Sequence, residues 1–120
     1  MRSRILLVED DDDMRALYCF TLASAGFRVN AVKDGFEALT ELQLLHPDII
    51  ITDLAMPGID GIQLIGIIKS KVELAEIPVI AITAYGKSLQ RRAKSAGADL
   101  SVDKPDQSRD LCDLVTRVLP

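Results

Sequence analysis

Short runs of aliphatic and β-branched residues recur along the chain, and stretches with helical periodicity separate them. Runs of this kind are typical of strands, and the central ones are nearly continuous Ile and Val, as in parallel strands covered on both faces. The pattern predicts five strands, at residues 4–8, 27–32, 48–52, 78–83 and 100–103.

The intervening segments are predicted to be helices with one apolar side. The residues on that side are Met14, Leu17, Tyr18 and Leu22 in the first helix and Leu111, Leu114, Val115 and Val118 in the last. Gly26 and Gly97 lie where the first and fourth helices should end, and Gly35 opens the second. The fourth helix, around residues 88–96, has only Leu89, Ala93 and Ala96 on its apolar face. We therefore expect it to be the least firmly packed element.

Five strands that alternate with helices imply a three-layer α/β/α sandwich around a parallel sheet with right-handed crossovers. For a chain of 120 residues the common solution is the flavodoxin-like arrangement, with strand order 2-1-3-4-5. The chain has no internal repeat, low-complexity tract or linker, so we expect residues 1–120 to form a single domain.

Composition and charge narrow the classes of function. Apolar residues make up 48% of the chain and charged residues 27%, as in globular proteins. The net charge of −4 argues against direct contact with nucleic acid, which needs a basic face. No apolar run approaches the ~20 residues of a membrane span, and no signal peptide is evident. Cys19 and Cys112 have no CxxC spacing, and we interpret them as reduced core thiols of a cytosolic protein.

Polar side chains follow four of the predicted strands. Glu9 and Asp10 follow the first strand, Asp53 the third, Thr83 closes the fourth and Lys104 follows the fifth. The carboxyl ends of parallel strands meet at one edge of the sheet, where ligands bind near the switch point between the first and third strands. We therefore expect three carboxylates, a hydroxyl and an ammonium group to converge there.

Three carboxylates in one crevice repel one another, at a cost on the order of 3 kcal/mol per pair for ~5 Å and an effective dielectric constant of about 20. Such a cluster either raises its pKa values or binds a cation. Its donors are all oxygens, which favours Mg²⁺ over zinc. One carboxylate can then act as a nucleophile and form an aspartyl phosphate. Lys104 would neutralise the incoming charge, and Thr83 would donate to a phosphoryl oxygen.

Four motifs carry these residues: ILLVEDD at 5–11 with Arg15 downstream, DIIITDLAMPGIDG at 48–61, PVIAITA at 78–84 and DKP at 103–105. In this order and spacing the whole chain resembles the receiver domain of two-component response regulators. The resemblance implies that Asp53 accepts the phosphoryl group, that Asp10 binds Mg²⁺ directly and that Glu9 acts through a bound water. The main-chain carbonyl of Ala55 would complete the metal ligands.

The resemblance also implies that Thr83 is the switch hydroxyl and that Lys104 contacts the phosphoryl group. It further implies a cis peptide bond between Lys104 and Pro105. Receivers often carry Tyr or Phe three residues before the lysine, where this chain has Ser101, so the usual aromatic switch is in doubt. Our hypothesis is that Tyr85 reports the state of the switch instead.

Several acids are expected to have structural roles only. Asp12 and Asp13 should form the cap and first turn of the first helix, whereas the role of Asp11 stays open. Asp60 is expected to cap the helix that begins near Gly61. Asp48 and His46 are interpreted as turn residues before the third strand.

The resemblance implies a switch rather than an enzyme, with only self-catalysed phosphoryl transfer and slow autodephosphorylation. The expected partners are a histidine kinase or histidine phosphotransfer protein and an output domain or effector, in the cytoplasm and away from membranes. The fourth helix, fifth strand and fifth helix would form the switching surface. The sequence leaves open whether the protein forms a homodimer.

Three alternatives are weighed against this interpretation. A receiver-like scaffold that acts without phosphorylation stays open because of Ser101. A Mg²⁺-dependent phosphohydrolase usually has its nucleophile in a DxD motif after the first strand, whereas Asp53 follows the third. Flavin binding is disfavoured because the loop after the first strand is acidic, where a phosphate cradle needs amides and hydroxyls.

Overall fold

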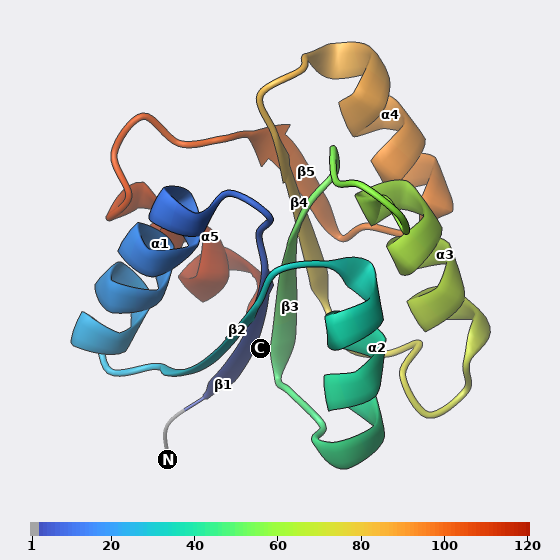
Figure 1. Cartoon of the computed structure of the whole chain (residues 1–120), viewed down its shortest axis with the longest axis horizontal. Helices are drawn as coiled ribbons and strands as arrows, with labels where there is room; N and C mark the ends of the chain where they lie inside the picture. Colours follow the sequence, from blue (N-terminus) through green and yellow to red (C-terminus); the bar gives the residue numbers. More distant parts are fainter. Residues whose placement is uncertain (1–2) are drawn as a thin grey trace.

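The computed structural model describes residues 3–120 and has a central sheet between two layers of helices (Figure 1). The strands are β1 (Arg4–Val8), β2 (Arg28–Val32), β3 (Ile49–Asp53), β4 (Val79–Thr83) and β5 (Leu100–Asp103). The helices are α1 (Asp12–Ser24), α2 (Gly35–Leu44), α3 (Gly61–Ser70), α4 (Lys87–Ala96) and α5 (Asp110–Val118). All neighbouring strands pair in parallel in the order β2-β1-β3-β4-β5, which confirms the predicted flavodoxin-like sandwich.

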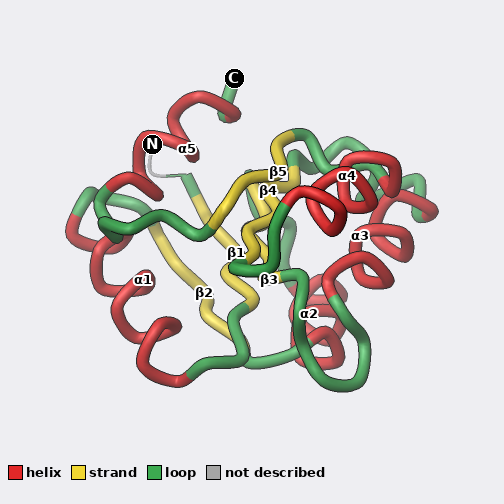
Figure 2. Tube along the Cα trace, turned by 90° about the horizontal axis from the view of Figure 1, so that it is seen from above, coloured by secondary structure: helices red, strands yellow, loops and turns green. Residues whose placement is uncertain are grey.

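The sheet is buried on both faces, as the continuous apolar strands predict. In β1, Leu6 and Val8 pack on the side covered by α2, α3 and α4, whereas Ile5 and Leu7 pack on the side covered by α1 and α5 (Figure 1). β2 lies at one edge of the sheet, next to β1, and β3 lies between β1 and β4. The ends of β1, β3 and β4 therefore meet at one rim, which Figure 2 shows from above.

The helix ends follow the sequence signals closely. Asp60 caps α3 through a capping box, because its Oδ1 accepts the Gln63 amide at 2.8 Å and the Gln63 side chain accepts the Asp60 amide at 3.0 Å. Gly26 and Gly97 have φ values of 100° and 121°, which favour glycine just after α1 and α4. Gly35 opens α2, as predicted.

Two expectations for α1 are wrong. Asp11, not Asp12, is the N-cap, and its Oδ1 accepts the Met14 amide at 2.9 Å. Asp12 and Asp13 both lie in the first turn, where a carboxylate is favoured by the helix dipole. Leu17 is 46% exposed because it lies off the side of the helix that faces the sheet, whereas Tyr18 and Leu22 are fully buried.

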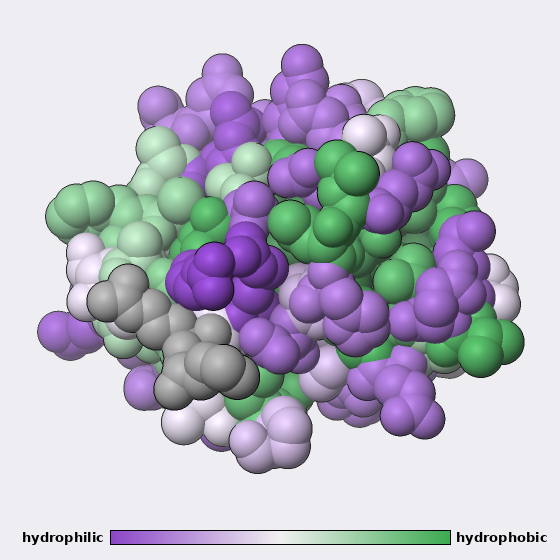
Figure 3. Space-filling view, turned by 90° about the horizontal axis from the view of Figure 1, so that it is seen from below, coloured by the Kyte–Doolittle hydropathy of each residue, from purple (hydrophilic) through white to green (hydrophobic). Residues whose placement is uncertain are grey.

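The segment before β3 has the structural role expected of it. Asp48 Oδ2 accepts the Arg4 amide at 2.7 Å and so links the entry of β3 to that of β1. The His46 Nε2 atom lies 3.2 Å from the Glu73 carbonyl oxygen. Seen from below, the surface near the strand starts mixes hydrophilic and hydrophobic side chains, as exposed surfaces generally do (Figure 3).

The two cysteines are free and half-buried beside the α1–α5 side of the core. In residues 3–120, none of the helices has the length and apolar character that crossing a membrane requires.

α4 has few buried apolar residues and is hydrogen-bonded to residues in and just before β5. Ala93 is its one fully buried residue. The Ser101 hydroxyl donates to the Gln90 carbonyl oxygen at 2.9 Å, and Lys94 Nζ donates to the Asp99 carbonyl oxygen at 2.7 Å. Because apolar burial supplies most helix stability in proteins, this geometry agrees with the expectation of a weakly packed helix.

Gly61 is required where α3 begins against the end of β3. Its amide donates to the Leu54 carbonyl oxygen at 3.0 Å. A methyl group at this position would lie 2.6 Å from Leu54 Cα and would collide with the Asp53 carbonyl oxygen. The main chain of Asp53 is therefore fixed by direct contact with the first residue of α3.

We expect Gly61→Ala to lower the free energy of unfolding by about 1–3 kcal/mol, the usual cost of overpacking. Gly66→Ala is the matched control on the same helix, because a methyl group there meets no atom within 4 Å. It should raise the free energy of unfolding by about 0.4–1 kcal/mol. Urea denaturation of both variants measures the difference, and equal effects would contradict the close approach at Gly61.

We expect amide hydrogens in α4 to exchange faster than those in α3, which buries Leu64, Ile65 and Ile68. Helices with few buried apolar contacts open at lower free energy. Native-state hydrogen exchange followed by NMR measures this difference. Equal protection of the amides of Leu64 and Ala93 would show that the polar contacts alone hold α4 as firmly as α3.

Candidate phospho-acceptor site

The ends of four strands bring the predicted site residues together. Glu9 and Asp10 follow β1, Asp53 is the last residue of β3, Thr83 is the last of β4 and Lys104 follows β5. The Glu9 amide donates to the Val32 carbonyl oxygen at 3.1 Å, so the β1 end continues the sheet pairing by one residue.

Three carboxylates gather at this rim, as predicted. Glu9, Asp10 and Asp53 each present an oxygen within 4.8 Å of the others. Glu9 is fully buried and Asp53 is 3% exposed, whereas Asp10 is exposed. The cluster therefore has a buried floor and one side chain open to solvent.

Lys104 supplies the compensating positive charge. Its Nζ lies 2.9 Å from Glu9 Oε1 and 3.2 Å from Asp53 Oδ2, so one ammonium group spans two buried carboxylates. Burial acts to lower the pKa of Lys104, but its contacts with Glu9 and Asp53 outweigh this effect and raise the pKa above its usual range. Lys104 is therefore a permanent cation at the rim.

The ammonium group of Lys104 does not fully offset the cost of ionising the buried carboxylates. Burial, with a smaller contribution from the charge of Asp53, raises the pKa of Glu9 to about 7, although Lys104 and the Asp11 amide act against it. Burial also raises the pKa of Asp53, against the opposing effects of Lys104 and the Ala55 amide, which donates to Oδ1 at 3.3 Å. Cation binding would stabilise the ionised form of both groups.

The donor set fits a hard divalent cation. Within residues 3–120, Lys104 is the one partner of the buried Glu9 Oε1 atom, at 2.9 Å, so this atom can also take a cation as a ligand. All the nearby donors are carboxylate oxygens, which suit Mg²⁺. Ala55 lies beside Asp53 through its amide contact, and the role of its carbonyl as a ligand stays a prediction.

Thr83 and Tyr85 are linked through the loop after β4. Thr83 is fully buried, its Oγ1 accepts the Tyr85 amide at 3.0 Å and its carbonyl oxygen accepts the Lys104 amide at 2.9 Å. The Tyr85 side chain is 73% exposed. Thr83 thus connects the strand that ends beside Asp53 to both the β4–α4 loop and Lys104.

Ser101 lies outside the carboxylate cluster. Its hydroxyl donates to the Gln90 carbonyl oxygen on α4, and Gln90 Nε2 donates to Asp103 Oδ1 at 2.6 Å. At the position where an aromatic switch was in doubt, the chain therefore has a polar link between β5 and α4.

The expected cis peptide bond between Lys104 and Pro105 is wrong for this structure, which has no cis bond in residues 3–120. The trans form is the default even before proline, and the expectation rested on resemblance alone. The trans bond still leaves Lys104 Nζ in contact with Glu9 and Asp53.

Arg15 has a contact that the sequence did not reveal. Its Nη1 donates to the Glu9 carbonyl oxygen at 3.0 Å, and its Nη2 pairs with Asp12 Oδ1 at 2.6 Å. Arg15 therefore fixes the main chain of Glu9 from the first turn of α1. Arg15 was noted downstream of the first motif, but its place in the sequence does not say which groups its side chain contacts.

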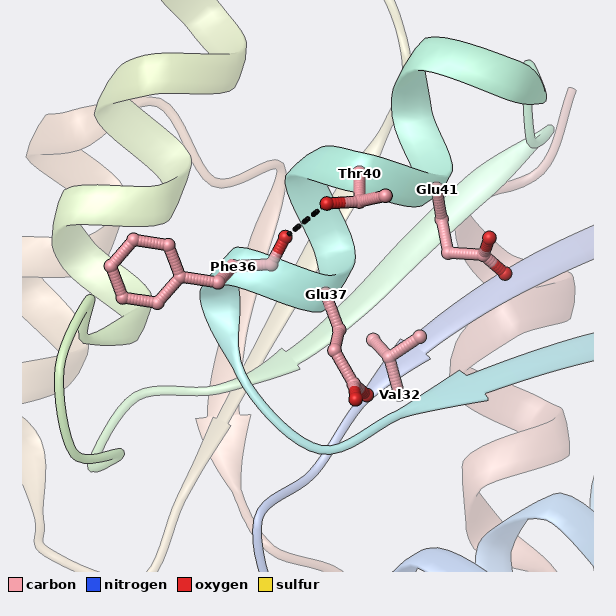
Figure 4. Close-up of a pocket in the computed structure, with 5 residues that line it drawn as sticks. All are labelled: Val32, Phe36, Glu37, Thr40 and Glu41. Atoms are coloured by element: carbon pink, nitrogen blue, oxygen red, sulfur yellow. Dashed lines mark hydrogen bonds between the residues drawn. The ribbon is translucent and has the colours of Figure 1, made fainter.

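A surface pocket beside α2 lacks comparable chemistry. Its lining residues are Val32, Phe36, Glu37, Thr40 and Glu41 (Figure 4). The Thr40 hydroxyl is already bonded to the Phe36 carbonyl oxygen at 3.0 Å, and neither glutamate belongs to the carboxylate cluster. This pocket therefore has no group of carboxylates like the one at the rim.

Comparisons with known proteins agree with this geometry. The family profile described as the response regulator receiver domain matches residues 5–116. The phosphate regulon transcriptional regulatory protein PhoB of Klebsiella pneumoniae is 34% identical over 120 residues, which are 99% of this chain and 52% of PhoB. The chain thus spans about half the length of that relative.

Two solved structures show the same fold over their whole length. Chemotaxis protein CheY4 of Vibrio cholerae superposes with a TM-score of 0.93 and 28% identity, covering 99% of this chain and 100% of that one. The receiver domain of sensor histidine kinase PA1611 from Pseudomonas aeruginosa has a TM-score of 0.89, 28% identity and 98% coverage of both chains. Its active-site cleft holds a coordinated magnesium ion. This chain belongs to the response regulator receiver domain family.

Proposed function

We propose that residues 1–120 form one receiver domain, which changes its state when Asp53 accepts a phosphoryl group. The observation that carries the proposal is the convergence of Glu9, Asp10 and Asp53 within 4.8 Å, with Lys104 spanning two of them. Glu9, Asp10 and Asp53, with the Ala55 carbonyl, would hold Mg²⁺. When bound, the ion would neutralise charge on the carboxylates and on the phosphoryl oxygens.

The transfer needs a nucleophile and a good leaving group. An Asp53 carboxylate oxygen attacks phosphorus, and the P–N bond of a phosphohistidine breaks with its electron pair passing to the imidazole nitrogen of the donor. Asp53 sits at the end of β3, fixed by Gly61 on one side and by the Ala55 amide on the other. Lys104 lies close enough to Asp53 to contact the phosphoryl oxygens after the transfer.

Thr83 would couple the phosphoryl group to the surface. Its hydroxyl now accepts the Tyr85 amide, so its own proton is free to donate to a phosphoryl oxygen. A shift of Thr83 would disturb the β4–α4 loop first. We propose that α4, β5 and α5 are the surface that changes, because α4 is weakly packed and bonded to β5 through Ser101.

The proposed partners are a histidine kinase or histidine phosphotransfer protein, which would supply the phosphoryl group, and an output domain or effector. The free thiols Cys19 and Cys112 fit a reducing cytoplasmic setting. The domain would turn over only its own phosphate and would not act as an enzyme on external substrates. A second candidate is a receiver-like scaffold that acts without phosphorylation, because Ser101, at the position of the usual aromatic switch, lies outside the carboxylate cluster.

We expect acetyl phosphate and Mg²⁺ to add one phosphoryl group to the chain, and Asp53→Asn to abolish the addition because the nucleophile is lost. Mass spectrometry of the intact chain measures it. Asp13→Asn is the matched control, since Asp13 is an exposed acid in the first turn of α1. It should be labelled like the wild type.

Labelling of Asp53→Asn to the same extent would place the phosphate elsewhere. Absence of labelling in the wild type would favour the scaffold. Steady release of phosphate from an external ester would favour a phosphohydrolase.

We also expect the ring signals of Tyr85 to shift in the NMR spectrum when Asp53 is phosphorylated, because the Tyr85 amide is bonded to Thr83. The chain has two tyrosines, so the variant Tyr85→Phe assigns the signals. Unchanged Tyr85 signals in a fully phosphorylated sample would rule out this residue as the reporter of the switch.

A further inference from the structure

The charge of α4 differs in sign from that of the whole chain. The helix contains no acid, and its basic residues are Lys87, Arg91, Arg92 and Lys94, whereas the chain has a net charge of −4. Each of these side chains is exposed. Within residues 3–120, none of them forms a salt bridge with a carboxylate. α4 is therefore a cationic surface on an acidic protein.

Three of these cations lie along one side of the helix. Lys87 and Arg91 are four residues apart and Arg91 and Lys94 are three apart, so their side chains are neighbours. Arg92 lies more than a quarter turn around the helix from each of them. We call Lys87, Arg91 and Lys94 the basic row.

Folding does not explain the basic row. Like charges at these spacings destabilise a helix, and the helix dipole disfavours a cation at its first residue. Lys87 is that first residue, and the first turn of α4 has no acid. Lys94 has a structural contact, since its Nζ donates to the Asp99 carbonyl oxygen at 2.7 Å. Lys87 and Arg91 disfavour the helix that carries them, which points to a role in binding.

The acids at the two ends of β5, beside α4, are engaged elsewhere. Asp99 Oδ2 accepts the Val79 amide at 2.8 Å and lies 3.4 Å from Lys69 Nζ. Asp103 Oδ1 accepts a hydrogen bond from Gln90 Nε2 at 2.6 Å. These carboxylates therefore do not pair with the basic row.

A pocket lies beside the basic row, between α4 and β5. It has a volume of about 430 Å³ and is lined by Gln90, Arg91, Lys94, Ser95, Leu100 and Ser101. Ser101 is short and its hydroxyl donates to the Gln90 carbonyl oxygen, so it leaves this space unfilled. The aliphatic stems of Arg91 and Lys94, with Leu100, give the pocket apolar walls. Because β5 is an edge strand, the pocket lies at the edge of the sheet, where a partner can reach it.

We propose that α4 and β5 dock an acidic segment of another protein, whose carboxylates face the basic row and whose one apolar side chain enters the pocket beside Ser101. Charge complementarity selects the acidic partner, and the apolar walls select a protein segment over nucleic acid. A symmetric dimer centred on α4 would bring two basic rows together, which disfavours a second copy of this chain. The proposal rests on the proposed function only in taking this segment to belong to the output domain or effector.

Selection from a display library of random dodecapeptides, with the immobilised wild-type chain as target, tests the chemistry of the partner. We expect the selected peptides to be rich in Asp and Glu around one apolar residue. Their affinity should fall as the salt concentration rises. Selection of neutral or basic peptides, or of no peptide, would overturn the proposal.

Arg91→Glu reverses the charge at the centre of the basic row. We expect the affinity for a selected peptide, measured by fluorescence anisotropy, to fall about tenfold, because a repulsion replaces an attraction. Arg92→Glu is the matched control, since it makes the same change of charge on the same helix outside the row. It should bind nearly as tightly as the wild type. Equal losses in the two variants would show a response to net charge alone and would overturn the proposal.

Ser95→Trp fills the pocket and leaves every cation in place. It should weaken binding about tenfold, and replacing the apolar peptide residue by alanine should then have little further effect, because the pocket is already occupied. Ser88→Trp is the matched control, since Ser88 is exposed two turns earlier on the same side of α4 and does not line the pocket. An equal loss in Ser88→Trp, or fully additive losses in Ser95→Trp, would overturn the docking in the pocket. Circular dichroism and urea denaturation identify any variant that does not fold.

The docking proposal and the proposed function fail differently, because the binding measurements use the unphosphorylated chain. If the wild type takes up no phosphoryl group, the proposed function fails even when acidic peptides bind. If Asp53 is labelled but binding does not depend on Arg91, only the docking proposal fails. A dimer in sedimentation that Arg91→Glu dissociates, or a DNA duplex bound more tightly than the selected peptides, would assign the row to a second copy or to nucleic acid and overturn the proposal.

Discussion

The site depends on one ammonium group shared by two buried carboxylates. At about 3 Å and an effective dielectric constant of about 20, each contact of Lys104 with Glu9 or Asp53 is worth about 5 kcal/mol. Removing each ion from water costs several kcal/mol, so the cluster adds little net stability. Its value is that Asp53 stays buried beside a cation without being fixed to one partner, because Lys104 can leave either carboxylate for a new anion.

The topology of the sheet makes that arrangement unavoidable. β3 lies between β1 and β4, so a residue at the end of β3 is flanked by whatever follows the other two strands. Gly61 then brings α3 against the main chain of Asp53, where any side chain would collide. Asp53 is thus positioned by rigid elements on both sides, whereas Lys104 and Thr83 lie at the ends of strands and are followed by loops.

Sequence reasoning predicted the strands to within one residue and brought the five polar residues to one rim, because runs of Ile and Val locate parallel strands strongly. It failed where the choice was between chemically equal neighbours. Five acids in a row leave the helix start ambiguous by one residue, and Asp11 rather than Asp12 is the cap. It also could not show that the Tyr18 hydroxyl is unsatisfied, since that depends on the packing of α1 against the sheet and α5.

If phosphorylation moves Thr83, as proposed, the change would act on hydrogen bonds, at a place where an aromatic switch was in doubt. Thr83 is bonded to Tyr85 through its hydroxyl and to Lys104 through its carbonyl, and Ser101 bonds β5 to the Gln90 carbonyl on α4. Hydrogen bonds of this kind exchange partners without opening a cavity, whereas moving a buried aromatic ring leaves a void that costs free energy. With one fully buried residue, α4 also has little apolar burial to hold it in one position. The proposed switch would therefore act on hydrogen bonds that can break one at a time.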